Sequence, residues 1–210
     1  MTTRTLVVAS GNQGKVDEFK ALLAGLPLHV CAIGEIVSTP VNVIEDGRTF
    51  ADNAIKKAKA AANASGMLTL ADDSGLEVDA LDGRPGIRSA RFAGEHASAT
   101  QNNDALLAAL ARLGESGKST VYRARFRCVL AVVDPRSGRG EASIAEGTCE
   151  GTLTLTPRGA GGFGYDPLFV VAGLDKTMAE LTRDEKNRLS HRARALGVLR
   201  PLLAAICDQT

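Results

Sequence analysis

A stretch of alternating side chains in the middle of the chain constrains the fold most. In residues 120–133, apolar side chains occupy every second position of the first part, and three arginines stand between them. This period-two pattern predicts a β-strand with one buried face, and such a strand needs partners in a sheet. Turn-forming residues at 134–138 and a second run at 142–150 predict an antiparallel neighbour. The arginines fit either a solvated sheet face or a phosphate-binding stripe, and we favour the solvated face.

Segments with strand and helix patterns alternate along the rest of the chain. Short apolar runs at 5–9 and 67–71 predict buried strands, the second ending at an acidic pair. Residues 15–26, 49–64 and 100–113 have the spacing of amphipathic helices. This mixture predicts an α/β or mixed α+β fold, with a central mixed β-sheet and flanking helices.

Two predicted helices contain specific local signals, a capping box in one and an internal proline in the other. Thr49 and Asp52 have the spacing of a capping box ahead of the segment 49–64, with Asp in place of the usual Glu or Gln. A last helix is expected from about residue 190 to 206, and Pro201 predicts a kink within it.

The composition limits the possible classes of function. A length of 210 residues predicts one domain, covering residues 1–210. Because 25 basic and 24 acidic residues nearly balance, we expect no nucleic-acid partner. No apolar run approaches the roughly 18 residues of a membrane span, so we expect no membrane partner. The 4 cysteines form no CxxC pair, which is typical of a reducing compartment, and the expected location is the cytoplasm.

Residues 10–15 form the first candidate binding segment. They follow an apolar strand and precede a helix, and their two glycines allow a tight turn that exposes backbone N–H groups. Lys15 adds a positive charge, so the segment suits a polyphosphate. An ordinary glycine-containing turn between strand and helix fits equally well.

An acidic run, Asp72-Asp73-Ser74-Gly75, is the second candidate. Carboxylates beside a core are costly unless they are paired, and a divalent cation such as Mg²⁺ is a natural partner for them. If the strand continues this far, adjacent side chains point to opposite faces, and only one aspartate faces the site. A turn that uses Asp and Ser for local backbone bonds is the alternative. Glu45 becomes a plausible metal ligand only together with Asp73.

Two segments near the C-terminus complete the set. Residues 159–167 hold Phe163 and Tyr165 among four glycines, which suits ring stacking on a nucleobase, with Asp166 accepting from base N–H groups. A flexible surface loop with aromatic anchors is the alternative. Residues 185–192 place basic side chains beside a helix N-terminus, where they oppose the helix dipole and favour a bound anion over a plain charged surface.

Taken together, these segments resemble the inosine triphosphate pyrophosphatase family, also called the Ham1-like family or non-canonical purine NTP pyrophosphatases. The resemblance runs from about residue 5 to residue 205. It is carried, in family order, by SGNQGKVDEF, EDGRTFADNAIKKA, ADDSGLEVDALDGRPGIRSARFAG, GGFGYDPLF and TMAELTRDEKNRLSHRARAL. One mild departure is Asp52, where the family more often has Glu.

The resemblance implies hydrolysis of ITP, dITP and XTP to the monophosphate and pyrophosphate. It implies a homodimer with two lobes around an active-site cleft. Glu45 and Asp73 would hold Mg²⁺, with Mn²⁺ as an alternative, and Asp73 would be the catalytic proton acceptor. The substrate-binding positions would be Ser10, Gly11, Asn12, Gln13, Gly14, Lys15, Ser74, Phe163, Gly164, Tyr165, Asp166, Lys186, His191 and Arg192.

Donors from His191 or Arg192 would bond the 6-keto group of hypoxanthine or xanthine and oppose the amino group of adenine. Two other readings of the sequence stay open. One is a related pyrophosphatase for another modified nucleotide, and the other is a sensor that binds a triphosphate without cutting it. The sequence also leaves open whether Asp72 has a structural or a supporting role.

Overall fold

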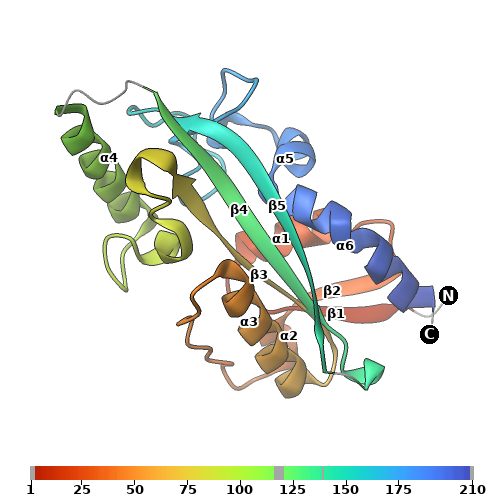
Figure 1. Ribbon diagram of the computed structural model, residues 1–210. Helices are drawn as coiled ribbons and strands as arrows, with labels where there is room; N and C mark the ends of the chain where they lie inside the picture. The colour runs from red at the N-terminus through yellow and green to blue at the C-terminus, as the bar shows by residue number, and fades with distance from the viewer. Residues whose placement is uncertain (1–2, 116–120, 139, 209–210) are drawn as a thin grey trace. The chain divides into compact units, whose positions relative to one another are not determined.

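A computed structural model describes residues 3–115, 121–138 and 140–208 and has a mixed α/β fold (Figure 1). Among these residues, the strands form a 6-stranded sheet in the order β2-β1-β3-β4-β5-β6. They are β1 (Arg4–Val8), β2 (Leu28–Ala32), β3 (Leu68–Val78), β4 (Tyr122–Val133), β5 (Ala142–Leu153) and β6 (Phe169–Val171). Because β1 pairs in parallel with β2 and β3 while β5 and β6 are antiparallel, the sheet is mixed, as predicted.

Four helices of the described residues correspond to the segments with predicted helical spacing. The α-helices of these residues are α1 (Gln13–Leu22), α2 (Ile33–Ile36), α3 (Phe50–Ser65), α4 (Ala99–Glu115), α5 (Arg183–Leu189) and α6 (His191–Asp208). The capping box of α3 is confirmed, since Thr49 Oγ1 accepts from the backbone N–H of Asp52 and the Asp52 carboxylate accepts from that of Thr49. Helix α6 continues through Pro201. None of these helices is both long and apolar enough to cross a membrane.

Among the predicted strands, one end differs from the structure and one start lies outside the described residues. The predicted start of the central strand at residue 120 lies outside the described residues, and β4 begins at Tyr122. The prediction that the strand from residue 67 ends at the acidic pair is wrong, because β3 continues through both aspartates to Val78. The strand tolerates these carboxylates because each has cationic or N–H partners, described below.

The chain divides into two compact units, which we call the first unit and the second unit. The first unit comprises Met1–Asp73, Cys128–Gly147 and Arg192–Thr210, and the second comprises Ser74–Arg127 and Thr148–His191. The core of the first unit joins strand residues to α1 and α6 and includes Leu6, Val8, Val16, Phe19, Leu68, Leu70, Leu130, Leu196, Leu199 and Leu203. In this unit α3 buries a stripe of alanines, which lets the helix lie close to its neighbours.

The second unit has its own core. Apolar side chains of β3, α4, β4, β6 and the segment before β6 form it, including Leu76, Val78, Leu106, Leu110, Phe126, Tyr165, Leu168 and Phe169. The predicted alternation in β4 is confirmed here, since Tyr122, Ala124 and Phe126 are buried. Arg125, on the opposite face, contacts Glu77, Asp79 and Glu150. This set of ion pairs supports the solvated-face interpretation of the arginines.

Candidate functional site

The loop after β1 closes tightly onto the start of α1. Asn12 is the N-cap residue, and its side-chain oxygen accepts from the backbone N–H of Lys15 at 3.2 Å. Ser10 Oγ accepts from the backbone N–H of Asn12 at 3.1 Å. The helix begins at Gln13, two residues earlier than predicted, so Gly14 and Lys15 lie in its first turn. Lys15 therefore adds its positive charge to the N-terminal, positive end of the α1 dipole.

Asp72 lies at the centre of a buried ion-pair network in the first unit. Its carboxylate accepts from Nζ of Lys15 at 3.0 Å and from Nε of Arg192 at 3.1 Å. The Arg192 guanidinium also donates to Glu18 at 3.0 Å. Burial alone would raise the pKa of Asp72, but the charges of Lys15 and Arg192 outweigh it and hold the pKa well below its usual range. Asp72 is therefore an ionised anchor for two expected substrate-binding cations.

Asp73 points to α3 instead. Its carboxylate accepts from Nδ2 of Asn53 at 3.1 Å and from Nζ of Lys57 at 2.9 Å. The same Lys57 ammonium group lies 3.3 Å from Oε2 of Glu45. Burial raises the pKa of Asp73, and the Glu45 charge adds to this, although Lys57 and Asn53 oppose it. Asp73 is therefore more basic than an ordinary aspartate, which suits a proton acceptor.

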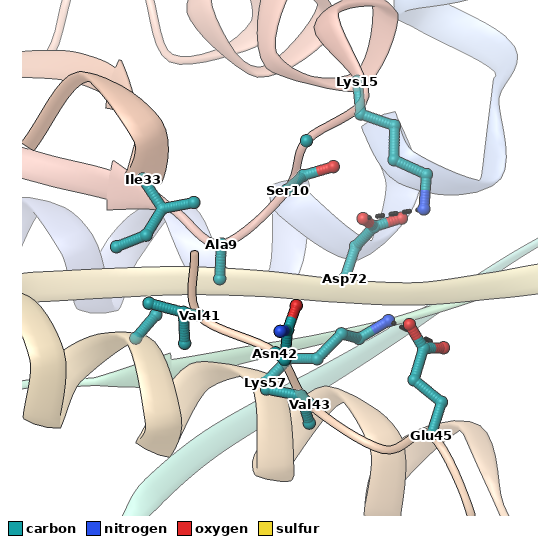
Figure 2. Close-up of a pocket in the computed structure, with 12 residues that line it drawn as sticks. Ala9, Ser10, Lys15, Ile33, Val41, Asn42, Val43, Glu45, Lys57 and Asp72 are labelled. Carbon is teal, nitrogen blue, oxygen red and sulfur yellow. Dashed lines mark hydrogen bonds and ion pairs between the residues drawn. The ribbon is translucent and has the colours of Figure 1, made fainter. Parts of the chain in front are cut away.

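A pocket of about 310 Å³ lies next to these groups in the first unit (Figure 2). Its lining includes the loop residues Ser10, Gly11 and Lys15. Figure 2 shows Lys15 with Asp72 on one side of β3 and Lys57 with Glu45 on the other. The pocket thus brings together residues from three of the sequence-predicted segments: the loop at residues 10–15, Glu45, and Asp72 of the acidic run.

Glu45 and Asp73 fit a divalent cation by their chemistry and convergence. Nζ of Lys57 lies 3.3 Å from Oε2 of Glu45 and 2.9 Å from Oδ1 of Asp73. The two carboxylates therefore converge on a position that holds a positive charge. Within the described ranges there is no group of three or more His, Cys, Asp or Glu residues with metal-binding geometry. Mg²⁺ is usually held by one or two carboxylates together with substrate phosphates and water, and this pair matches that pattern.

A second cluster, in the second unit, is built on Asp166. Its Oδ2 atom accepts from the backbone N–H of Phe163 at 3.0 Å and from Nζ of Lys186 at 2.7 Å. The Lys186 ammonium group lies 5.0 Å from the centre of the Phe163 ring, a cation–π contact. Gly162 has a φ of 76°, and a Cβ at this position would lie 2.0 Å from the Asp166 carboxylate. The glycine-rich loop is therefore folded around this carboxylate.

The two aromatic rings of that loop have different environments. Tyr165 is buried, and its hydroxyl group donates to the backbone oxygen of Ser89 at 2.9 Å, so it anchors the loop in the core. Burial raises the pKa of Tyr165. Phe163 is only partly buried, which leaves it as the ring that can stack on a base. Gly164, between them, accepts a hydrogen bond from Asn103 at 3.1 Å.

The remaining predicted residues of the second unit are Ser74 and His191. Ser74 follows Asp73 in β3 and is partly buried. His191 is 4% exposed, and its ring stacks on Phe126 with the centroids 4.9 Å apart and the planes 20° from parallel. The stacking holds the imidazole in one plane, and a fixed plane suits a directional hydrogen-bond donor.

The model of the Ham1 family matches residues 6–202, nearly the whole chain. The chain belongs to the Ham1 family. A dITP/XTP pyrophosphatase of Desulforamulus reducens is 51% identical over 191 residues, covering 91% of each chain. A dITP/XTP pyrophosphatase of Bacillus subtilis is 47% identical over 199 residues, covering 95% of this chain and 96% of that protein.

Solved Ham1 structures have the same fold. A HAM1 protein from Coxiella burnetii matches with a TM-score of 0.83 and 38% sequence identity, over 98% of this chain and 100% of that one. The family resemblance and the mixed α/β fold expected from the sequence are therefore both confirmed.

The sequence interpretation missed several residues of this Ham1 site, including Asn53, Lys57 and Glu18. A signal for the first two was present, because residues four apart lie on the same face of a helix. Asn53 is a polar side chain within the alanine stripe of α3, and Lys57 follows it one turn later. Glu18 gave no comparable signal, since it lies among other polar residues of α1.

Proposed function

We propose that this protein hydrolyses the non-canonical purine nucleoside triphosphates ITP, dITP and XTP to the monophosphate and pyrophosphate. The geometry that carries the proposal is the meeting of Glu45 and Asp73 at one ammonium group, beside a pocket lined by Lys15. The near full-length similarity to dITP/XTP pyrophosphatases supports the same reaction and substrate class.

The phosphates are assigned to the loop at residues 10–15, and Lys186 of the second unit stays a proposed substrate-binding residue. Backbone N–H groups at the start of α1 and the Lys15 ammonium group neutralise the negative charge of the polyphosphate. This neutralisation lowers the barrier to attack by water on the α-phosphorus. The bond from this phosphorus to the bridging oxygen breaks, and pyrophosphate leaves.

Glu45 and Asp73 would hold Mg²⁺, or Mn²⁺ in its place. The cation supplies charge neutralisation on the phosphate oxygens when it is bound. Asp73 takes the proton from the attacking water. Asn53 and Lys57 hold the Asp73 carboxylate in place, and Asp72 keeps Lys15 and Arg192 in position.

The purine base is assigned to residues of the second unit and the start of α6. The Phe163 ring stacks on the base, and Asp166 fixes the backbone of Phe163 and accepts from base N–H groups. His191, with Arg192 as the second proposed donor, bonds the 6-keto oxygen. Adenine presents an amino group there, which would leave these donors unpaired.

We further propose that residues 1–210 act as one catalytic domain, that two copies form a homodimer, and that the enzyme works in the cytoplasm on the nucleotide pool. Light scattering of the purified protein tests the dimer directly. A molar mass of one chain across the working concentration range would contradict it.

A substrate panel tests the reaction. ITP, XTP, dITP, GTP and ATP are incubated with the protein at one Mg²⁺ concentration, and pyrophosphate and orthophosphate are measured separately. We expect pyrophosphate as the first product and the highest kcat/KM for ITP, dITP and XTP, with ATP, which lacks the 6-keto group, as a poor substrate. Orthophosphate as the first product excludes the proposed mechanism, and binding without turnover identifies a nucleotide sensor.

A further inference from the structure

The side-chain amide of Asn53, a residue of the first unit, makes hydrogen bonds through both its oxygen and its nitrogen. Its Oδ1 atom accepts from the backbone N–H of Gly47 at 2.8 Å, and its Nδ2 atom donates to Oδ2 of Asp73 at 3.1 Å. The residue is 0% exposed. A buried amide is costly unless it is hydrogen-bonded, and these two bonds satisfy both ends of the group.

The chain around Gly47 approaches this amide closely. A Cβ at position 47 would lie 2.5 Å from Oδ1 of Asn53 and 2.7 Å from Cβ of Asp52, distances that real Cβ atoms do not adopt. The segment therefore needs glycine to reach the amide. Glu45 lies two residues before Gly47, so the bond to Asn53 anchors the segment that carries Glu45.

The amide also sets the orientation of the Asp73 carboxylate. Because Asn53 bonds Oδ2 and Lys57 bonds Oδ1, the two carboxylate oxygens have different partners and the group cannot rotate without losing a bond. Lys57, which bonds Oδ1 of Asp73, also forms an ion pair with Glu45 through the same ammonium group. One side chain thus ties together the two segments whose carboxylates converge.

We propose that Asn53 is a positioning residue that sets the spacing of Glu45 and Asp73 for a divalent cation. The inference rests on the proposed function, because that function assigns the cation to this pair. A core amide that only stabilises the fold would make the same hydrogen bonds, so the two roles must be separated by a measurement of the cation.

The test compares Asn53→Leu and Asn53→Ser with a matched control, Asn63→Leu. Asn63 is an exposed residue of the same helix. Leu has a similar volume but removes both bonds, and Ser leaves space for water, so a folded variant is available if Leu disrupts the core. Mn²⁺ affinity is measured without nucleotide by electron paramagnetic resonance, and hydrogen exchange of the Gly47 amide by NMR.

We expect both Asn53 variants to bind Mn²⁺ about 10- to 100-fold more weakly than wild type. The Gly47 amide should exchange faster, because its acceptor is gone. In ITP hydrolysis, kcat should fall more than KM rises, because the Asn53 substitutions do not alter the loop at residues 10–15 that is proposed to bind the phosphates. Asn63→Leu should match wild type in all three measurements.

Three results would overturn the inference or the function separately. Mn²⁺ affinity within twofold of wild type in a folded Asn53 variant shows that Asn53 is structural only. A wild-type protein that binds no Mn²⁺ also overturns the positioning role, whatever its activity. If wild type binds Mn²⁺ more tightly than the Asn53 variants, as expected, but does not hydrolyse ITP, only the proposed function is overturned.

Discussion

Asp72 and Asp73 are neighbours in β3, yet their carboxylates lie on opposite faces of the strand. Asp72 accepts from Lys15 and Arg192, whereas Asp73 accepts from Asn53 and Lys57. In the first unit this places α1 and α6 on one face of β3 and α3 on the other. The split separates two proposed roles: Asp72 holds the side chains of Lys15 and Arg192, and Asp73 is the proposed proton acceptor.

Replacing Asp73 with Asn removes the proposed proton acceptor and one cation ligand while it keeps the shape of the side chain. We expect pyrophosphate release from ITP to fall by about 10²- to 10⁴-fold. Circular dichroism and thermal unfolding should remain those of a folded protein. Turnover near the wild-type rate would remove Asp73 from both roles.

Replacing Lys57 with Met removes the ammonium group that lies between the carboxylates of Glu45 and Asp73. We expect the free energy of unfolding without metal to fall by roughly 1–3 kcal/mol, the cost of unsatisfied buried groups. Added Mg²⁺ should raise the stability of this variant more than that of wild type. Urea unfolding measures both effects.

The neighbouring Lys56 provides the control for that experiment. Its ion pair with Asp46 is exposed, with 46% and 65% of the two side chains accessible. We expect Lys56→Met to change the unfolding free energy by no more than about 1 kcal/mol, with no added response to Mg²⁺. Equal losses in the two variants would contradict the role given to Lys57.

Replacing Phe163 with Ala removes the proposed stacking surface for the base. Stacking on an aromatic side chain contributes about 1–3 kcal/mol per base, so ITP affinity should fall about 5- to 150-fold. Free pyrophosphate has no base, and its affinity should change much less. Calorimetric titrations with the two ligands test this, and equal losses would argue against a base platform.

Glu185 caps the start of α5, the helix that carries Lys186. A backbone hydrogen bond from Thr182 and the contact with Lys176 lower the pKa of Glu185 to about 2. Because the pKa is lower in the folded state than the unfolded value of about 4.3, the contribution to stability is complete above that value. It is lost as the pH falls toward 2. A ¹³C NMR titration should find this low pKa, and an ordinary value near 4.3 would contradict the cap.

The sequence predicted the elements whose signals are local. Capping spacing at Thr49 located α3, and period-two alternation located β4. The opposite orientations of Asp72 and Asp73 also follow from strand geometry once the strand is known to continue.

The continuation of β3 itself could not be predicted, because its cause lies far away in the chain. Two adjacent charges normally end a buried strand, and here Lys15 and Arg192 compensate Asp72 from distances of 57 and 120 residues. The position of Tyr165 had a similar cause. Its place in the core depends on the backbone of Ser89, 76 residues earlier, which no local pattern reveals.

The uninterrupted strand at Asp72 and Asp73 also makes the number of residues in β3 critical. Deleting or inserting one residue between Leu68 and Ala71 would turn every later side chain to the opposite face. A deletion would place Asp73 opposite Lys15 and Arg192, and an insertion would place Asp72 opposite Asn53 and Lys57. We therefore expect this segment to tolerate substitutions better than a one-residue insertion or deletion, which would move the proposed catalytic carboxylate to the wrong face of the strand.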